Sequence, residues 1–206
     1  MEKISDTAAE HHVDYVGAKM GMWVFLFTEL LLFGGLFLLY SVYRLRYAAD
    51  FHRSAAELDI FLGTANTVIL LTSSLSMVCS LLAMKKEKTN LSLLLQIVTI
   101  LSGVLFLVNK FIEWSAHIER GIYPDSPVVL AMSGGEIIFY SLYYVMTGIH
   151  GLHVLVGVGL ISATVIFTFR RTIGPSNFVK LENTGLYWHF VDIIWIYLFP
   201  LFYLIT

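Results

Sequence analysis

The segment WVFLFTELLLFGGLFLL, residues 23–39, is the clearest indication of the fold of this chain. It holds one ionisable side chain, Glu29, and lies within a longer apolar run from about Gly17 to Tyr43. A helix needs about 20 mostly apolar residues to cross the hydrocarbon core of a bilayer. We therefore predict a transmembrane helix here, with one carboxyl group near its middle.

Four further apolar runs follow, and the second to fourth runs end in charged or helix-breaking residues. They extend from about Leu58 to Met84, Leu91 to Glu113 or beyond, Gly135 to Phe169, and Gly185 to Ile205. Only helices satisfy every backbone polar group within such runs, whereas a β-barrel would show alternating segments of about ten residues. The predicted fold is all-α, a polytopic membrane bundle of five transmembrane helices at 17–206 after a polar N-terminal tail at 1–16.

The composition agrees with a membrane protein and excludes several other classes. Of the 206 residues, 57% are hydrophobic and 14% are charged, whereas soluble domains are about 45–50% apolar and about 25% charged. An ordinary water-soluble enzyme, a disordered protein and a disulfide scaffold are thereby excluded. The net charge of −2 gives no indication of a nucleic-acid partner. Cys79 is the single cysteine and has no partner for an internal disulfide, and the polar first 15 residues do not form a signal peptide.

Basic residues predict the orientation of the bundle, because five spans place the two termini on opposite sides. One side would carry Lys3, Lys19, Lys85, Lys86, Lys88, Arg170, Arg171 and Lys180. The other would carry Arg44, Arg46, Arg53 and Arg120. Basic loops favour the cytoplasmic side, so we expect the N-terminus inside and the C-terminus outside.

Glu29 is the sharpest functional candidate, since an ionisable group inside a bilayer costs a few kcal/mol on insertion scales. It lies about 18 Å along the helix from Gly17, at about 1.5 Å per residue. No charged residue within one helical turn compensates it. Two interpretations stay open at this point: a carboxyl group that exchanges protons, and a protonated carboxyl group that is hydrogen-bonded to a neighbouring helix.

The other ionisable residues of the spans are better explained by structure than by chemistry. Lys110 and Glu113 are three residues apart and can pair across a helical turn. Because they fall late in their span, we expect both side chains to reach the membrane surface. Glu136 opens the fourth run, where a negative charge suits the start of a helix.

Two histidine pairs have the same spacing. His150 and His153 lie on one helix face, as a metal site could use, but further ligands of suitable spacing are missing. We expect neutral imidazoles bonded to adjacent helices, and no metal or cofactor. His189 and Asp192 are expected to stabilise each other, in a structural role rather than in a proton path. The pairs Gly34-Gly35 and Gly157-x-Gly159 predict close helix contacts.

Four segments together carry a resemblance to a known family. They are GMWVFLFTEL at 21–30 with FGGLF at 33–37, NTVILLTSS at 66–74, YVMTGIHGLHV at 144–154 with Gly157, and YWHFVDIIW at 187–195. The weaker match FIEW at 111–114 adds an acidic–aromatic pair in the third run. The chain resembles subunit III of the haem–copper oxidases, the cytochrome c and quinol oxidases, in the short form that lacks two leading helices.

The resemblance implies a non-redox accessory subunit of a respiratory terminal oxidase in a membrane, with a bacterial inner membrane favoured. It implies packing against oxidase subunit I and other oxidase subunits, support of proton uptake, and protection of the catalytic subunit during turnover. Haem and copper would belong to the partners, and this chain would hold no catalytic residue, cofactor or metal. The buried carboxylate of the family maps onto Glu29, and the family implies structural or interhelical roles for Glu113, His150, His153, His189 and Asp192.

The remaining expectations concern a bound phospholipid and three alternative functions. In long family members, phospholipids occupy a cleft beside the two leading helices, so a phospholipid bound here would need a seat formed with subunit I or another neighbour. One alternative is a subunit-III-like partner of nitric oxide reductase. Another is a small proton-coupled transporter using Glu29 and the histidines, against which the chain lacks an inverted repeat and broken half-helices. A metalloenzyme using His150, His153 and His189 is the weakest alternative.

Overall fold

The computed structural model describes residues 2–205, and the side chains of residues 16–205. Its helices are α1 (Glu2–Arg46), α2 (Ala48–Ala55), α3 (Ile60–Lys85), α4 (Thr89–Glu119), α5 (Pro127–Leu130), α6 (Gly134–Phe169) and α7 (Val179–Tyr203). Within the described residues the only β-type pairing is one isolated bridge between Gly174 and Asn177. The predicted all-helical fold is confirmed.

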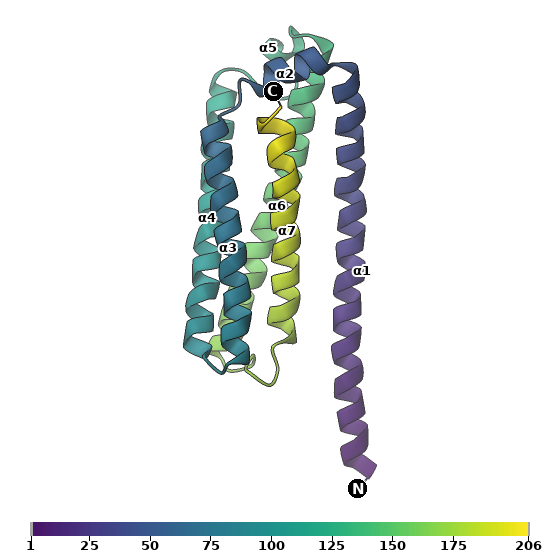
Figure 1. Ribbon diagram of the computed structural model, residues 1–206, viewed down its shortest axis with the longest axis vertical. Helices are drawn as coiled ribbons and strands as arrows, with labels where there is room; N and C mark the ends of the chain where they lie inside the picture. The colour runs from purple at the N-terminus through teal and green to yellow at the C-terminus, as the bar shows by residue number, and fades with distance from the viewer. Residues whose placement is uncertain (1, 206) are drawn as a thin grey trace.

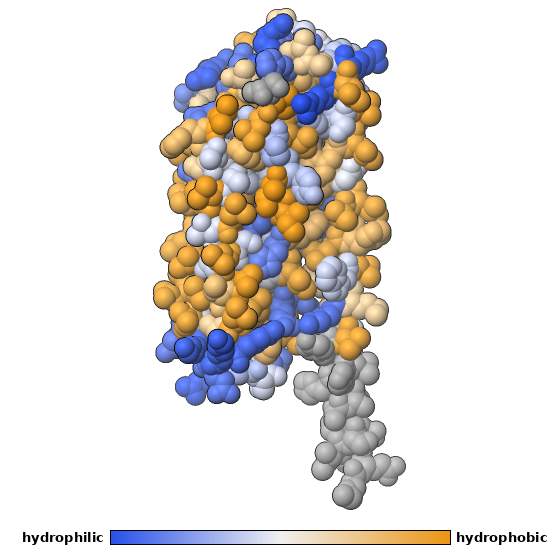
Figure 2. All heavy atoms as spheres, in the orientation of Figure 1, coloured by the Kyte–Doolittle hydropathy of each residue, from blue (hydrophilic) through white to orange (hydrophobic). Residues whose placement is uncertain are grey.

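Five of these helices are long and apolar enough to cross a membrane, as the sequence predicts. The spans are Val16–Arg46, Ile60–Lys85, Thr89–Glu119, Gly134–Phe169 and Val179–Tyr203. Figure 2 shows apolar side chains over the middle of the molecule and hydrophilic ones gathered toward its two ends. This is the surface that a bilayer and its two aqueous boundaries require.

Four of the spans form a closed ring. Helix α3 packs on α4, α4 on α6, α6 on α7, and α7 on α3. Helix α1 lies outside this ring and packs against α6 and α7, and Figure 1 shows it standing to one side of the other four. The two ends of the chain lie at opposite ends of the molecule in Figure 1, as an odd number of spans requires.

The ring is packed around two tryptophans of α7. Trp188 and Trp195 are both fully buried, and each indole N–H finds an oxygen on α3. Trp188 Nε1 donates to Ser73 Oγ at 3.0 Å, and Trp195 Nε1 donates to Thr67 Oγ1 at 3.0 Å. Buried indoles usually bond through their N–H, and these two bonds hold α7 against α3.

Glycine lets neighbouring helices approach the first of these indoles. A Cβ added to Gly157 would lie 2.7 Å from Trp188 Cε3, and one added to Gly103 would lie 2.7 Å from Trp188 Cη2. The close contact predicted at Gly157 is therefore confirmed. A Cβ on Gly34, Gly35 or Gly159 would meet nothing within 4 Å, so the prediction is wrong for these three within the described chain.

The end of the bundle that carries the C-terminus is closed by α2 and α5, two short helices that we did not predict (Figure 1). Helix α6 begins there with a capping box between Ser133 and Glu136, which confirms the helix-start interpretation of Glu136. The Glu136 carboxylate also accepts a hydrogen bond from Arg53 of the α2 segment at 3.0 Å. Gly135 lets α2 lie close to the start of α6, because a Cβ there would clash with the side chain of Asp50.

Candidate functional site

Glu29 contacts a histidine that the sequence also singles out. Its Oε2 lies 3.0 Å from His153 Nε2, which joins the middle of α1 to α6. The side chain of Glu29 is 18% exposed and that of His153 is 15% exposed, so the contact is largely but not completely buried. Phe33 and Tyr187 place their rings 5.3 Å and 6.4 Å from the imidazole centre, and these rings limit the access of other polar groups.

The hydrogen bonds of His153 define what this contact can do. His153 Nδ1 lies 2.8 Å from the carbonyl oxygen of Ile149. A carbonyl oxygen only accepts, so Nδ1 carries a hydrogen and Nε2 of the neutral ring has a free lone pair. The contact with Glu29 then requires one proton between Nε2 and Oε2, placed on either partner. The contact therefore holds one proton between the two side chains inside the span.

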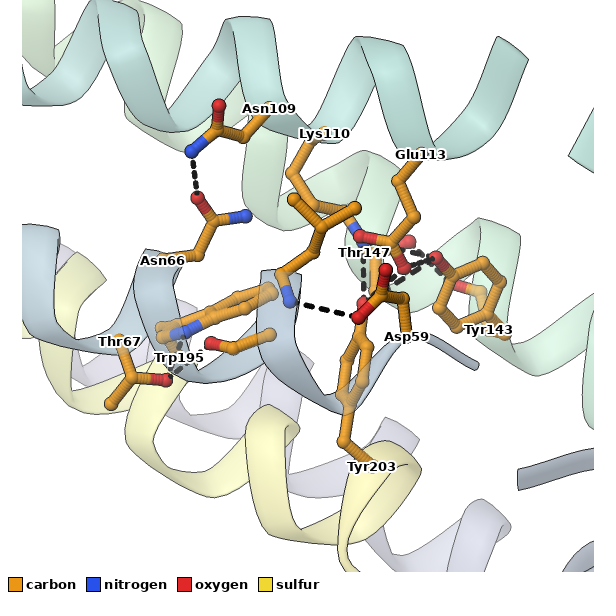
Figure 3. Close-up of polar contacts among 12 residues, drawn as sticks. Asp59, Asn66, Thr67, Asn109, Lys110, Glu113, Tyr143, Thr147, Trp195 and Tyr203 are labelled. Atoms are coloured by element: carbon orange, nitrogen blue, oxygen red, sulfur yellow. Dashed lines mark hydrogen bonds and ion pairs between the residues drawn. The ribbon is translucent and has the colours of Figure 1, made fainter. Parts of the chain in front are cut away.

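A second ionic group lies inside the ring of four helices (Figure 3). Lys110 Nζ donates to Glu113 Oε2 at 3.1 Å, to Tyr143 OH at 3.0 Å and to Tyr203 OH at 2.9 Å. Both phenols donate in turn to Glu113 Oε1 at 2.5 Å. We call these four side chains the Lys110 cluster. It ties α4 to α6 and α7.

The cluster confirms the predicted pairing of Lys110 with Glu113 and corrects their predicted place. Lys110 is 7% exposed and Glu113 is 2% exposed, so neither side chain reaches the membrane surface. The two phenols explain the difference, because they supply the partners that water would otherwise supply. Lys110 Nζ also lies 5.5 Å from the ring centre of Trp195, an attractive position for a cation.

The two histidines of the H-x-x-H motif have different surroundings. His153 faces Glu29, whereas His150 is fully buried between the rings of Phe106 and Trp195. Neither ring nitrogen of His150 has a hydrogen-bond partner among the described residues. The expected bond to an adjacent helix is thus present for His153 and absent for His150.

His189 and Asp192 do not form the predicted pair. His189 Nδ1 lies 2.7 Å from Ser74 Oγ on α3. Asp192 is 2% exposed. Neither of its carboxylate oxygens has a hydrogen-bond partner of normal geometry in residues 16–205, and the nearby polar side chain is that of Ser74. Packing of α7 against α3 turns His189 toward the serine instead of along its own helix.

No three His, Cys, Asp or Glu side chains converge to hold a metal ion in the part of the chain that the structure describes. Glu29, Glu113 and His189 each bond to a side chain of another helix. The side chains of His150 and Asp192 are buried without a hydrogen-bond partner among residues 16–205.

Several polar residues of the interior are not predicted from the sequence. Tyr143 and Tyr203 complete the Lys110 cluster, and Asn109 Nδ2 donates to Asn66 Oδ1 at 2.9 Å between α4 and α3. Farther along α4, Gln96 Nε2 donates to Ser92 Oγ at 3.2 Å, and Gln96 Oε1 accepts from Thr164 Oγ1 of α6 at 3.0 Å. A hydroxyl or amide side chain within an apolar run could have identified them, because such a group needs a hydrogen-bond partner inside a membrane.

An apolar groove separates α1 from α7 along part of their length. It has a volume of about 500 Å³, and its lining is apolar except for the polar atoms of Trp23, His189 and Tyr197. The α1 side extends from Trp23 to Phe37 and the α7 side from Leu186 to Tyr197.

These features define a class: a polytopic helical membrane protein whose buried ionisable groups join its own helices. The chain belongs to the family described as cytochrome c oxidase subunit III, which matches residues 3–206. A Staphylococcus haemolyticus protein named "Probable quinol oxidase subunit 3" is 33% identical over 189 residues, covering 91% of this chain and 88% of that protein. The "Cytochrome c oxidase subunit 3" of Thermostichus vulcanus is 34% identical over 203 residues, covering 96% and 91%. The chain is thus an integral membrane protein related to subunit III of haem–copper oxidases, within a family of multi-subunit respiratory oxidases.

Proposed function

We propose that this chain is a non-redox accessory subunit of a respiratory terminal oxidase and that it packs against the haem–copper subunit I. The match across nearly the whole chain to oxidase subunits III supports this assignment. The dispersal of its ionisable groups into contacts between its own helices agrees with a supporting role. In this proposal the haem and copper centres belong to partner subunits.

Glu29 is proposed to support proton uptake and the stability of the oxidase during turnover. The observation that carries this role is the contact between Glu29 and His153, which holds one proton between two helices. Partial exposure of both side chains lets that proton exchange with a neighbouring group. Glu113, His150, His153, His189 and Asp192 are proposed to act as interhelical or structural polar groups.

A bound phospholipid is part of the same proposal. The groove between α1 and α7 extends over 14 residue steps from Trp23 to Phe37, which is about 21 Å of helix. One acyl chain covers about half of the hydrocarbon core of about 30 Å. The groove is therefore long enough and apolar enough for an acyl chain, with a partner subunit covering its open side.

The orientation and location are proposed from charge and from the relatives. The ends of α3 and α6 carry basic loops at one side of the bundle, which favours placing this side and the N-terminus in the cytoplasm. The staphylococcal relatives are bacterial, so the proposed location is the bacterial inner membrane, which is the cell membrane that bounds the cytoplasm.

Co-purification in mild detergent tests the assignment. A tagged copy of the full chain should bring down a haem-containing subunit I, visible in the reduced-minus-oxidised spectrum and by mass spectrometry. Recovery with a nitric oxide reductase, or with no haem protein at all, would contradict the proposal.

The role of Glu29 is tested by Glu29→Gln in that complex. The amide can still donate to His153 Nε2, so the contact is retained while the exchangeable proton is lost. We expect normal haem content and a normal initial rate of oxygen consumption, followed by earlier loss of activity. Glu119→Gln, on an exposed residue, is the matched control and should behave as the wild type. Loss of haem in the Glu29 variant would argue against an accessory role.

A further inference from the structure

Asp192 is a buried carboxyl group that the role proposed for Glu29 does not use. It lies near the middle of the span Val179–Tyr203 and is 2% exposed. Neither of its oxygens has a hydrogen-bond partner of normal geometry within residues 16–205. A lone carboxylate inside a membrane is unstable unless a cation or several donors compensate its charge. We therefore expect Asp192 to carry a proton in the folded chain.

Ser74 joins this carboxyl group to His189. Ser74 Oγ of α3 lies 2.7 Å from His189 Nδ1 of α7, and the Ser74 side chain is also the hydrogen-bonding neighbour of Asp192. Because His189 and Asp192 are three residues apart on α7, they lie on the same face of that helix. The serine hydroxyl thus lies between an acid and a base that form no hydrogen bond with each other.

His189 connects this arrangement with the surface of the molecule. Its Nε2 is not among the fully buried nitrogens that lack a partner, and His189 lines the groove between α1 and α7. Neither Ser74 nor Asp192 lines that groove. The imidazole is therefore the one of these three side chains through which a proton enters or leaves.

The serine hydroxyl can bridge the acid and the base in either direction. With a neutral carboxylic acid, Asp192 donates to Ser74 Oγ and Ser74 donates to His189 Nδ1, so the imidazole carries its hydrogen on Nε2. When the Asp192 O–H bond breaks, its proton bonds to Ser74 Oγ while the serine proton bonds to Nδ1. The products are an imidazolium ion that donates to Ser74 and a carboxylate that accepts from Ser74. The imidazolium then releases its Nε2 proton to a water molecule in the groove.

We propose that Asp192, Ser74 and His189 form a proton relay between a buried carboxylic acid of α7 and the groove between α1 and α7. The relay differs from the direct His189–Asp192 pair that the spacing predicts, because its central group belongs to α3. It is also separate from the contact between Glu29 and His153, since neither of those residues lines the groove. The relay does not depend on which oxidase the chain serves.

Infrared spectroscopy of the purified full chain in detergent micelles tests the relay. Its aspartate carboxyl groups are labelled with a heavy carbon isotope, which separates their bands from those of the glutamates. Asp192 is the only aspartate within the five spans. We expect a band of protonated aspartate that disappears in Asp192→Asn and that shifts after transfer to heavy water.

The rate of that shift measures the relay itself. Ser74→Ala should slow the shift by about tenfold, which is the effect of one lost hydrogen bond. Ser74→Thr keeps a hydroxyl group and should restore the rate, whereas His189→Phe removes both ring nitrogens and should slow the shift as Ser74→Ala does. Thr72→Val is the matched control on the same helix, because the Thr72 hydroxyl bonds to Val68 O, and it should exchange as the wild type does.

Two outcomes would overturn the proposal. Absence of a protonated aspartate band in the wild type would mean that Asp192 is ionised. A shift in Ser74→Ala as fast as in Thr72→Val would mean that the proton exchanges without the serine. Unchanged fluorescence of the buried Trp188 and Trp195 is the check that each variant is folded.

Discussion

The Lys110 cluster and the Glu29–His153 contact both place ionisable side chains inside the membrane, but their surroundings differ. Lys110 and Glu113 are enclosed by three helices of the ring and bonded to two phenols. Glu29 lies on the helix outside the ring, contacts His153 of α6, and remains partly exposed. The comparison indicates that the first group ties three helices together through several buried bonds, whereas the second is a single, partly exposed contact between α1 and α6.

Removing one charge from the Lys110 cluster should give the largest effect. Lys110→Met leaves the Glu113 carboxylate buried without its cation, which costs about 3–5 kcal/mol in such pairs. The free energy of unfolding, measured by sodium dodecyl sulfate titration in micelles, should fall by this amount. Lys86→Met, an exposed control, should stay within about 0.5 kcal/mol of the wild type. An equally small effect at Lys110 would mean that the cluster does not stabilise the ring.

Packing within the ring should also be sensitive to one methyl group. Gly157→Ala forces a Cβ to 2.7 Å from a carbon of the buried Trp188 ring, and overpacking of this kind costs about 1–3 kcal/mol. Gly159→Ala is the matched control two residues away, where the added carbon meets nothing within 4 Å. The same titration should separate the two variants, and equal stability would show that the ring yields easily around Trp188.

Loss of the α1 contact should have a smaller and more local effect. Glu29→Ala removes one interhelical hydrogen bond, and such bonds average about 0.6 kcal/mol in membrane proteins, with a maximum of about 1.7. Hydrogen exchange followed by mass spectrometry should show faster exchange in α1 and unchanged exchange in α3 and α4. Thr28→Ala is the control, because that hydroxyl bonds only to Phe25 O of its own helix. Faster exchange throughout the ring would contradict the distinction between the two regions.

The weakest expected effect lies near the start of the first span, at Lys19 of α1. Lys19 Nζ lies 2.9 Å from Glu182 Oε2, with the lysine side chain 34% exposed. Ion pairs this exposed contribute about 0–1 kcal/mol and are screened by salt. Lys19→Met should therefore lower the stability slightly at low ionic strength and not at all in molar salt. A loss that persists in molar salt would indicate a packing role for the lysine stem.

The fold can be predicted from the sequence because three features indicate the same helices. These are the long apolar runs, the charged or helix-breaking residues between them, and the need for every backbone polar group in a bilayer to be hydrogen-bonded. The predicted start of the fifth span at Gly185 is late by six residues, since α7 begins at Val179. The polar residues of the first turns, including Lys180, Glu182 and Asn183, conceal that start. The short helix α2 was missed because it lies outside the spans and carries no long apolar pattern.

The site was only partly predictable because its contacts join residues far apart in the chain. Spacing along one helix gave the Lys110–Glu113 pair, but it could not pair Glu29 with His153, which are separated by 124 positions. The same spacing argument predicted a His189–Asp192 pair, and tertiary packing with Ser74 replaced it. Pair contacts within a helix follow from sequence spacing, whereas contacts between helices depend on how the helices rotate against one another.

The central claim is that this chain supports an oxidase without performing its redox chemistry. The most direct test compares oxygen consumption over time by the purified oxidase complex with and without this chain, together with its haem content. We expect equal haem content and equal initial rates, with faster loss of activity when the chain is absent and recovery when the wild-type chain is restored. Loss of haem, or an initial rate near zero without the chain, would contradict it.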